Sequence, residues 1–189
     1  MKFTFKEINT KSNLISFIRL LMAIPLFILT GNIEEYRILL IILMIIGCFT
    51  DFLDGYLARK YNEVTEFGKI IDPLADKVAI SAVVLQLFLS GLIPSGYFAI
   101  IIMRDIIIFL GGIYVSKKIN KVLPSNLLGK ITVFFISIFM ILIVIGLNKN
   151  NILYEALMYV TILLSIFSVI GYFIRGYDSL KWKNKNEII

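Results

Sequence analysis

The chain alternates between long apolar stretches and short polar breaks. Six apolar segments of roughly 17–23 residues can be drawn, and they cover residues 14–30, 37–58, 69–89, 95–116, 127–147 and 152–174. An α-helix rises about 1.5 Å per residue, so segments of this length cross the hydrocarbon core of a bilayer, which is about 30 Å thick. The pattern predicts an all-α, polytopic membrane protein with six transmembrane helices.

The breaks between these segments carry residues that are typical of turns. They are Gly31-Asn32, Ser90-Gly91 with Pro94, Pro124-Ser125-Asn126, and Asn148 to Asn151. Neither an internal repeat nor a low-complexity linker divides the segments. We therefore expect a single membrane domain over residues 1–189, with a short basic amino-terminal segment at 1–12 and a carboxyl-terminal tail at 176–189.

Composition supports the membrane assignment and narrows the chemistry. The chain is 59% hydrophobic and 17% charged, with a mean hydropathy of +0.90, whereas soluble domains are nearer half apolar and about a quarter charged. It contains no histidine, which excludes imidazole catalysis and imidazole metal ligation. Its single cysteine excludes an internal disulfide.

The net charge of +6 reflects a strong asymmetry in where the basic residues lie. Fourteen lysines and arginines fall at one set of segment ends, and two, Arg37 and Lys149, fall at the other. Cytoplasmic loops are enriched in basic residues, and the number of spans is even, so both termini should be cytoplasmic. The surplus of basic residues is explained as a topology signal, and it can also attract anionic lipid. We therefore expect a multi-pass protein of the cell membrane with no nucleic-acid partner.

Four aspartates lie beside or inside these apolar segments. Asp51 and Asp54 are spaced i, i+3, and Asp72 and Asp76 are spaced i, i+4, so each pair lies on one face of its own helix. The expected topology brings both pairs to cytoplasmic helix ends joined by a short loop. Four facing carboxylates repel one another unless cations lie between them. Carboxylates are hard ligands that suit Mg²⁺, Mn²⁺ or Ca²⁺, and four can hold two ions.

An arrangement without metal is the alternative for these acids. They would then form buried ion pairs or a proton relay, with Lys77 and Arg104 as available partners. We favour the metal site because intramembrane charge is costly and usually functional.

The residues between the two acid pairs suit a phosphate ligand. Gly55 removes a side chain where a ligand approaches the helix, and Ala58 does so one turn later. Arg59 offers a planar donor fork to a phosphate, and Gly68 permits a tight loop or a close helix contact. Together they favour a metal-bound diphosphate with a flat group against the helix, although Gly55 alone also suits helix packing.

Residues 51–76 match the pattern D-x2-D-G-x2-A-R-x8-G-x3-D-x3-D without a gap, which resembles the signature of the CDP-alcohol phosphotransferase family. The resemblance implies a homodimer that transfers a substituted phosphate from a CDP-linked donor to an alcohol and releases CMP, with its active site facing the cytoplasm. It implies that Asp51, Asp54, Asp72 and Asp76 bind two divalent cations, Mg²⁺ or Mn²⁺. Asp76 would also be the base that deprotonates the attacking hydroxyl.

The resemblance also assigns the donor-binding residues. Gly55 and Ala58 would line the cytidine surface, and Arg59 would contact the donor phosphates, with Asp51 and Gly68 beside them. Asn13 resembles an asparagine near the start of the first span that assists nucleotide binding, although it also suits a helix N-cap. Thr65 occupies a loop position that often carries a small hydroxyl.

The acceptor alcohol is suggested by two further patterns. Asp72-Pro-Leu-Ala-Asp-Lys77 and the opening Asn-Leu-x4-Arg resemble phosphatidylglycerophosphate synthases, which implies CDP-diacylglycerol as donor and glycerol 3-phosphate as acceptor. A phosphorylated acceptor beside four acids needs cations. Those at predicted cytoplasmic helix ends are Lys77, Lys117, Lys118, Lys130 and Arg175.

Three alternatives stay open. Met103-Arg104-Asp105 and Pro124 to Lys130 resemble cardiolipin synthases of the CDP-alcohol type, which use phosphatidylglycerol as acceptor, and phosphatidylinositol-phosphate synthases share the acid motif. We expect Arg104 and Asp105 to lie mid-span and to form buried pairs with other helices. A cation transporter is the alternative from a different class, but transport does not require the Gly-Ala-Arg nucleotide surface.

Overall fold

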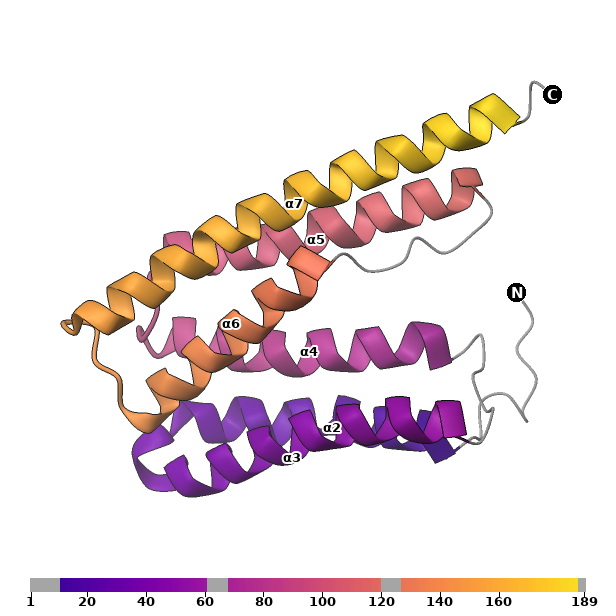
Figure 1. The fold of residues 1–189 in the computed structure, drawn as a ribbon. Coiled ribbons are helices and arrows are strands. Elements are labelled where there is room, and N and C mark those ends of the chain that lie inside the picture. Colours follow the sequence, from indigo (N-terminus) through magenta and orange to yellow (C-terminus); the bar gives the residue numbers. More distant parts are fainter. Residues whose placement is uncertain (1–10, 61–67, 120–126, 187–189) are drawn as a thin grey trace. The chain divides into compact units, whose positions relative to one another are not determined.

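A computed structural model of the chain describes residues 11–60, 68–119 and 127–186, and these are almost entirely helical. The described helices are α2 (Lys11–Gly31), α3 (Ile33–Lys60), α4 (Gly68–Leu89), α5 (Ser95–Ile119), α6 (Leu127–Ile145) and α7 (Ile152–Asn186) (Figure 1). Each predicted apolar segment coincides with one of them, which confirms the all-α prediction.

The end of α7 differs from the predicted boundary. The apolar pattern stops at residue 174, but the helix continues to Asn186, so residues 176–186 of the expected tail are helical. Hydropathy marks where an apolar environment ends. The helix itself continues because the residues after Gly176 include neither proline nor another glycine to stop it.

Four described helical stretches are long and apolar enough to cross a bilayer, as expected of a multi-pass membrane protein. They are Asn13–Gly31, Ser95–Ile119, Leu127–Ile145 and Ile152–Trp182. The described side chains of α4 form a shorter apolar stretch, Lys77–Leu89. Six spans and the direction of the termini remain predictions.

Three of the four predicted breaks are confirmed as turns. Asn32 alone separates α2 from α3. After α4, Gly91 has a φ of +68°, a left-handed conformation that glycine adopts without steric cost and that commonly ends helices. Asn151 caps α7, because its side-chain oxygen accepts a hydrogen bond from the Leu153 amide at 2.9 Å. The break predicted at 124–126 lies outside the described residues.

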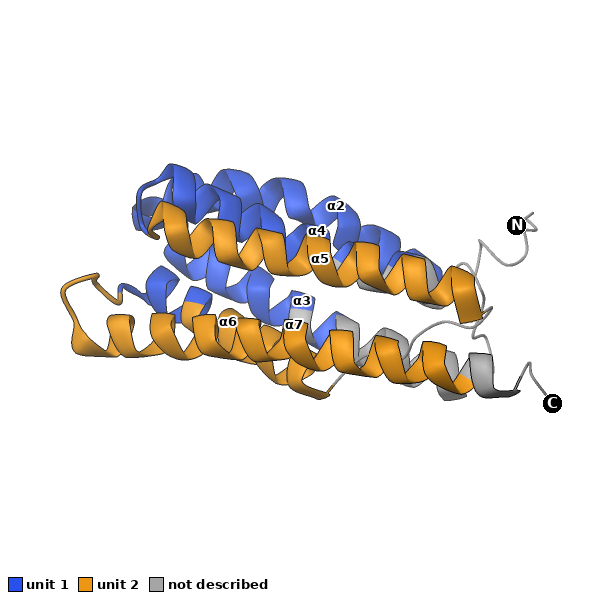
Figure 2. Cartoon of the chain, turned by 90° about the horizontal axis from the view of Figure 1, so that it is seen from above, with its two compact units in different colours: residues 1–92, 140–146 blue, residues 93–139, 147–189 orange. Residues whose placement is uncertain are grey.

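The chain divides into two compact units, and each is described by itself. Unit 1 comprises residues 1–92 and 140–146, and unit 2 comprises residues 93–139 and 147–189 (Figure 2). Unit 1 contains α2, α3, α4 and the last turns of α6. Unit 2 contains α5, most of α6, and α7.

In unit 1, α2 packs against both α3 and α4. A Cβ atom added to Gly31, at the end of α2, would lie 2.7 Å from Nε2 of Gln86, near the end of α4. The two helices therefore run parallel, while the one-residue turn at Asn32 sends α3 back along α2. As a result, the carboxyl end of α3 and the amino ends of α2 and α4 lie at the same end of unit 1.

In unit 2, α5 packs along α7. The hydroxyl groups of Tyr97 and Thr161 lie 3.1 Å apart, and a Cβ atom on Gly176 would lie 3.2 Å from Val115, so α5 and α7 run parallel. The ring of Phe139 on α6 contacts the rings of Tyr97 and Tyr154, with centroid distances of 5.5 and 5.0 Å. Because Phe139 lies late in α6 and its partners lie early in α5 and α7, α6 runs antiparallel to both.

Candidate active site

The acid motif lies on two helices of unit 1. Asp51 and Asp54 lie in the last third of α3, and Asp72 and Asp76 lie in the first half of α4. The rise along the helix axis is about 4.5 Å within the first pair and about 6 Å within the second. Because the carboxyl end of α3 and the amino end of α4 lie at the same end of unit 1, the fold brings both acid-bearing segments to that end.

The bounds of α3 and α4 also place the other motif residues. Gly55, Ala58 and Arg59 lie in the last two turns of α3, and Gly68 is the first residue of α4. Thr65 lies outside the described residues. The side chains of the motif residues are also outside the described part, so their ligand geometry stays a prediction.

The donor set at this end of unit 1 fits hard divalent cations. It offers carboxylate oxygens, which Mg²⁺ and Mn²⁺ prefer, and the chain has no histidine to compete. Among the side chains that the structure describes, there is no other group of three or more acids or cysteines suited to a metal ion. The motif acids stay the predicted ligands of a metal.

A stripe of buried polar residues runs along the first nine residues of α2. Asn13, Ser16 and Arg19 have exposed fractions of 3%, 0% and 3%. They are spaced three residues apart on one face, and the same face continues with the buried apolar residues Ala23 and Leu26. Charged and polar side chains within membrane-spanning helices are rare and usually functional, which makes this stripe at the motif end of unit 1 a candidate part of the site.

The position of Arg19 along the axis of unit 1 follows from the contacts of nearby residues on α2 and α4. Ala23 and Val78 line one groove, and Arg19 precedes Ala23 by one helical turn, or roughly 6 Å. Arg19 therefore lies at about the level of residues 72–76 of the parallel helix α4. The sequence predicts Asn13 as a site residue and places Arg19 in the Asn-Leu-x4-Arg pattern, but it assigns no role in donor binding to Ser16 or Arg19. Their spacing of three residues within an apolar segment is the signal that would have identified them.

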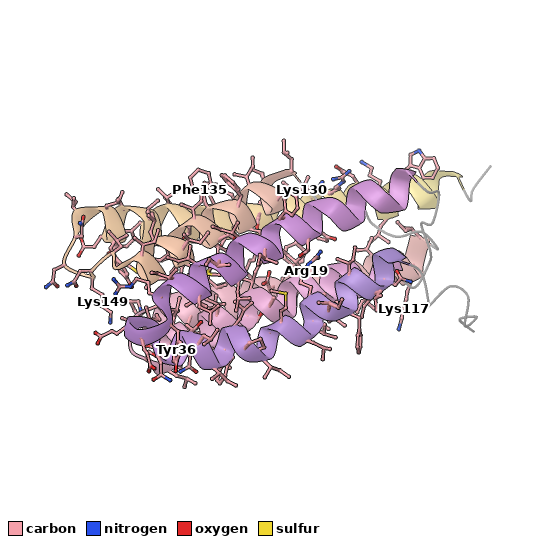
Figure 3. The ribbon with its side chains drawn as sticks, turned by 90° about the horizontal axis from the view of Figure 1, so that it is seen from below. Arg19, Tyr36, Lys117, Lys130, Phe135 and Lys149 are labelled. Carbon is pink, nitrogen blue, oxygen red and sulfur yellow. The ribbon has the colours of Figure 1, made fainter. Side chains whose placement is uncertain are left out.

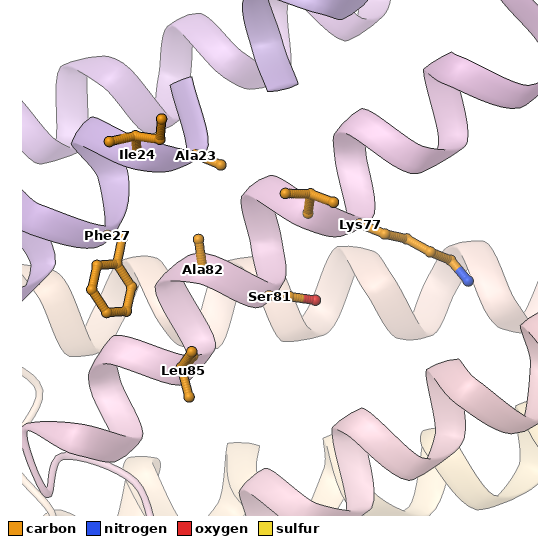
Figure 4. A pocket seen from close by; sticks show the side chains of 8 residues that line it. Ala23, Ile24, Phe27, Lys77, Ser81, Ala82 and Leu85 are labelled. Carbon is orange, nitrogen blue, oxygen red and sulfur yellow. The ribbon is translucent and has the colours of Figure 1, made fainter. Parts of the chain in front are cut away.

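The groove between α2 and α4 has a volume of about 450 Å³. Figure 4 shows Lys77 at one end of it and Phe27 and Leu85 at the other. Its lining residues are Ala23, Ile24, Phe27, Lys77, Val78, Ser81, Ala82 and Leu85. At about 100° per residue, the centre of the groove face of α4 is turned roughly 170° from the centre of the Asp72–Asp76 face. Lys77 thus belongs to a face of α4 that the acids do not share.

The other predicted acceptor cations lie in unit 2. Lys117 and Lys118 occupy the last turn of α5, and Arg175 lies on α7 beside Gly176, which faces Val115. These three are therefore at one level. Lys130 lies in the first turn of α6, next to Gly129, whose carbonyl oxygen is 3.3 Å from Nη2 of Arg104.

Lys130 therefore lies at about the level of Arg104. Arg104 and Lys117 are thirteen residues apart on α5, which corresponds to roughly 15–20 Å along the helix axis, and this distance also separates Lys130 from the Lys117 level. Figure 3 shows Lys117 at one end of the helices of unit 2, Lys149 at the other and Lys130 between them. Within unit 2 these cations do not form one cluster, so a single phosphate would meet Lys130 or the Lys117–Arg175 group.

Arg104 forms the buried contacts that its position predicts. It is 5% exposed, and it donates hydrogen bonds to Ser168 on α7 and to Gly129 on α6. Its salt bridge, however, joins Nη1 to the carboxylate of its own neighbour Asp105 at 2.6 Å. Pairing with other helices is therefore confirmed for Arg104, whereas Asp105 pairs within its own helix.

Comparison with known proteins adds a family and named relatives. The family model described as CDP-alcohol phosphatidyltransferase matches residues 9–167. The chain is 36% identical to a protein of Aquifex aeolicus strain VF5 over 174 residues, which cover 89% of this chain and 96% of that protein. It is 33% identical to a protein of Rickettsia bellii (80% and 87% covered), and 34% identical to one of Bacillus subtilis strain 168 (76% of each). All three bear the name CDP-diacylglycerol–glycerol-3-phosphate 3-phosphatidyltransferase.

Proposed function

Because this chain belongs to the CDP-alcohol phosphatidyltransferase family, we propose that it transfers a phosphatidyl group from CDP-diacylglycerol to glycerol 3-phosphate and releases CMP. The shared name of its relatives supports these substrates. The observation that carries the proposal is the placement of the four motif acids on the carboxyl-terminal part of α3 and the amino-terminal part of α4, which lie at the same end of unit 1. The protein is thus a membrane transferase of phospholipid biosynthesis.

Asp51, Asp54, Asp72 and Asp76 would hold two divalent cations, Mg²⁺ or Mn²⁺. When bound, such ions neutralise the diphosphate and stabilise the charge that develops during phosphoryl transfer. Asp76 accepts the proton of the attacking hydroxyl of glycerol 3-phosphate. That oxygen forms a bond to the phosphorus of the phosphatidyl group, the bond from this phosphorus to the bridging oxygen breaks, and CMP leaves with the electron pair.

The donor is held by α2 and α3. Gly55 and Ala58 lack large side chains, which leaves room for the cytidine against α3. Arg59 near the end of α3 and Arg19 on α2 supply positive charge for the two donor phosphates. The polar stripe of α2, at the level of residues 72–76, supports this role for Arg19.

We expect Arg19→Met to raise the KM for CDP-diacylglycerol by about tenfold to a hundredfold, because charge-assisted hydrogen bonds are worth about 1.5–3 kcal/mol. The KM for glycerol 3-phosphate should change much less. Arg19→Lys keeps the charge but loses the donor fork, so its effect should be intermediate.

The measurement is CMP release in detergent at saturating glycerol 3-phosphate. Arg37→Met is the matched control, because Arg37 lies at the opposite end of unit 1, beside Gly146. An unchanged KM for the donor in a folded Arg19→Met protein would remove Arg19 from the donor site.

For the acceptor phosphate, we propose Lys130 as the principal cation. Lys117, Lys118 and Arg175 lie at the level expected of residues that mark the membrane surface. Lys130 lies roughly 15–20 Å deeper along the helix axes, where a charge is costly and is usually kept for function.

We expect Lys130→Met to raise the KM for glycerol 3-phosphate more than the KM for the CDP-lipid. A phosphomonoester carries roughly −1.5 to −2 charges at neutral pH, so one lost contact should weaken acceptor binding about tenfold to a hundredfold. Arg175→Met tests the other cation group in the same steady-state assay. Equal effects of Lys130→Met on both substrates would contradict the assignment.

The membrane arrangement that we propose has six spans, cytoplasmic termini and an active site that faces the cytoplasm of a bacterial cell. The imbalance of fourteen basic residues to two supports it, and Lys117 and Lys149 lie at opposite ends of unit 2 (Figure 3). The homodimer rests on the family resemblance alone.

The proposed activity is tested by adding CDP-diacylglycerol, glycerol 3-phosphate and Mg²⁺ or Mn²⁺ to the purified protein in detergent. We expect CMP release that requires both the acceptor and the divalent cation. A cation transporter would release no CMP but would move ions across vesicle membranes, so the same preparation separates the two hypotheses.

A further inference from the structure

Arg104 links three helices of unit 2. Its Nε donates a hydrogen bond to Oγ of Ser168 on α7 at 3.1 Å, and its Nη2 donates to the carbonyl oxygen of Gly129 on α6 at 3.3 Å. Its Nη1 is held by the carboxylate of Asp105, the next residue of α5. All three nitrogens of this buried guanidinium are therefore engaged by protein groups.

The contact with Gly129 falls in the first turn of α6, one residue before Lys130. A second tie lies close by, because Oγ1 of Thr132 is 3.1 Å from the carbonyl oxygen of Leu164 on α7. Ser168 is itself fixed, since its hydroxyl donates to the carbonyl oxygen of Ser165 at 3.0 Å. The start of α6 is thus held against α5 by Arg104 and against α7 by Thr132.

A buried arginine within a membrane-spanning helix is costly and is usually functional. Because each of its three nitrogens already donates to a protein group, Arg104 is poorly placed to bind a phosphate itself. Its contact instead fixes the backbone from which Lys130 extends. Small displacements of a positioning group can cost large factors in rate or binding.

We propose that Arg104 is a positioning residue, which tethers the first turn of α6 so that Lys130 presents its ammonium group to the acceptor phosphate. The inference rests on the proposed role of Lys130 in binding glycerol 3-phosphate. It adds a residue from α5 that acts on acceptor binding through α6.

The test compares Arg104→Lys and Ser168→Ala with the wild type in steady-state CMP release. Arg104→Lys keeps a positive charge but loses the fork that reaches Gly129 and Ser168 together. We expect it to raise the KM for glycerol 3-phosphate by about tenfold, with a smaller rise for Ser168→Ala. The KM for CDP-diacylglycerol should change less than about twofold in both.

Tyr97→Phe is the matched control. It removes a buried hydroxyl that contacts Thr161 between the same two helices, seven residues before Arg104. If Arg104 only stabilises unit 2, Arg104→Lys should behave like Tyr97→Phe. Both variants would then have a lower thermal stability and unchanged KM values for both substrates. That result would overturn the proposal.

A double-mutant cycle with Lys130→Met gives the sharpest test, because residues that act through one another are not additive. If Arg104 acts through Lys130, Arg104→Lys should raise the KM for glycerol 3-phosphate in the wild type and hardly at all in Lys130→Met. Equal rises in both backgrounds would contradict the proposal. If Arg104→Lys does not fold, Ser168→Ala carries the same cycle.

The cycle also separates failure of this inference from failure of the proposed function. The wild type is assayed first, and absence of CMP release that depends on glycerol 3-phosphate would reject the function. An active wild type whose KM for glycerol 3-phosphate is unchanged in Lys130→Met would reject the role of Lys130 in acceptor binding, and with it the positioning role of Arg104, but not the proposed transfer reaction.

Discussion

Replacement of Asp51, Asp54 or Asp72 by asparagine is expected to abolish phosphatidyl transfer. Each substitution keeps the size of the side chain but removes the charge that a hard divalent cation requires. The amide oxygen of asparagine is a neutral and weaker ligand, and the chain has no histidine that could replace the lost carboxylate. Loss of one electrostatic stabiliser of a transition state typically costs about 10²–10³ in turnover, and we expect at least this loss for each variant.

The measurement is CMP release by purified variants over a range of Mg²⁺ and Mn²⁺ concentrations, with binding of Mn²⁺ followed by electron paramagnetic resonance. Asp178→Asn is the matched control, because Asp178 is an exposed aspartate on α7 outside the motif. Full activity in excess EDTA would reject the metal requirement for the whole group.

Asp76→Asn should separate turnover from donor binding. Asparagine does not accept the hydroxyl proton, and general-base catalysis contributes about 10²–10⁴-fold. The remaining three acids should still hold at least one ion, so CDP-diacylglycerol binding should survive in part. Asp76 therefore differs from the other motif acids in having two roles.

This difference is measured by competition with a labelled cytidine nucleotide alongside single-turnover assays. We expect undetectable transfer with donor binding within about tenfold of the wild type. Normal turnover in Asp76→Asn would remove Asp76 from the role of base. Complete loss of donor binding in Asp76→Asn would show instead that Asp76 is required to bind the donor.

The helices were predictable because their signals are local. An apolar run long enough to cross a bilayer is read from consecutive residues, and Gly31-Asn32, Gly91 and Asn151 lie at the ends of helices as their turn chemistry predicts. The end of α7 was not predictable in this way, because polar residues such as Lys181 end an apolar pattern without ending a helix.

The candidate site was predictable in part. The spacing of the four aspartates places each pair on one helix face. The packing of α3 and α4 along α2 explains why the carboxyl end of α3 and the amino end of α4 lie at the same end of unit 1. The contacts of Arg104 with Gly129 and Ser168 join residues that are 25 and 64 positions apart, and no local pattern specifies such partners. Hydropathy also locates the apolar segments along the chain but not the relative heights of packed helices. The separation of Lys130 from Lys117 along the helix axes is set by packing and could not be predicted from the sequence.

The most direct test of the proposed function is an acceptor screen with radiolabelled CDP-diacylglycerol. It compares glycerol 3-phosphate, phosphatidylglycerol, inositol 1-phosphate and serine under identical conditions with Mg²⁺ or Mn²⁺. We predict a labelled phosphatidylglycerophosphate product with glycerol 3-phosphate and little product with the other three. A product from phosphatidylglycerol with none from glycerol 3-phosphate would contradict the account and would support the cardiolipin synthase alternative suggested by Arg104-Asp105.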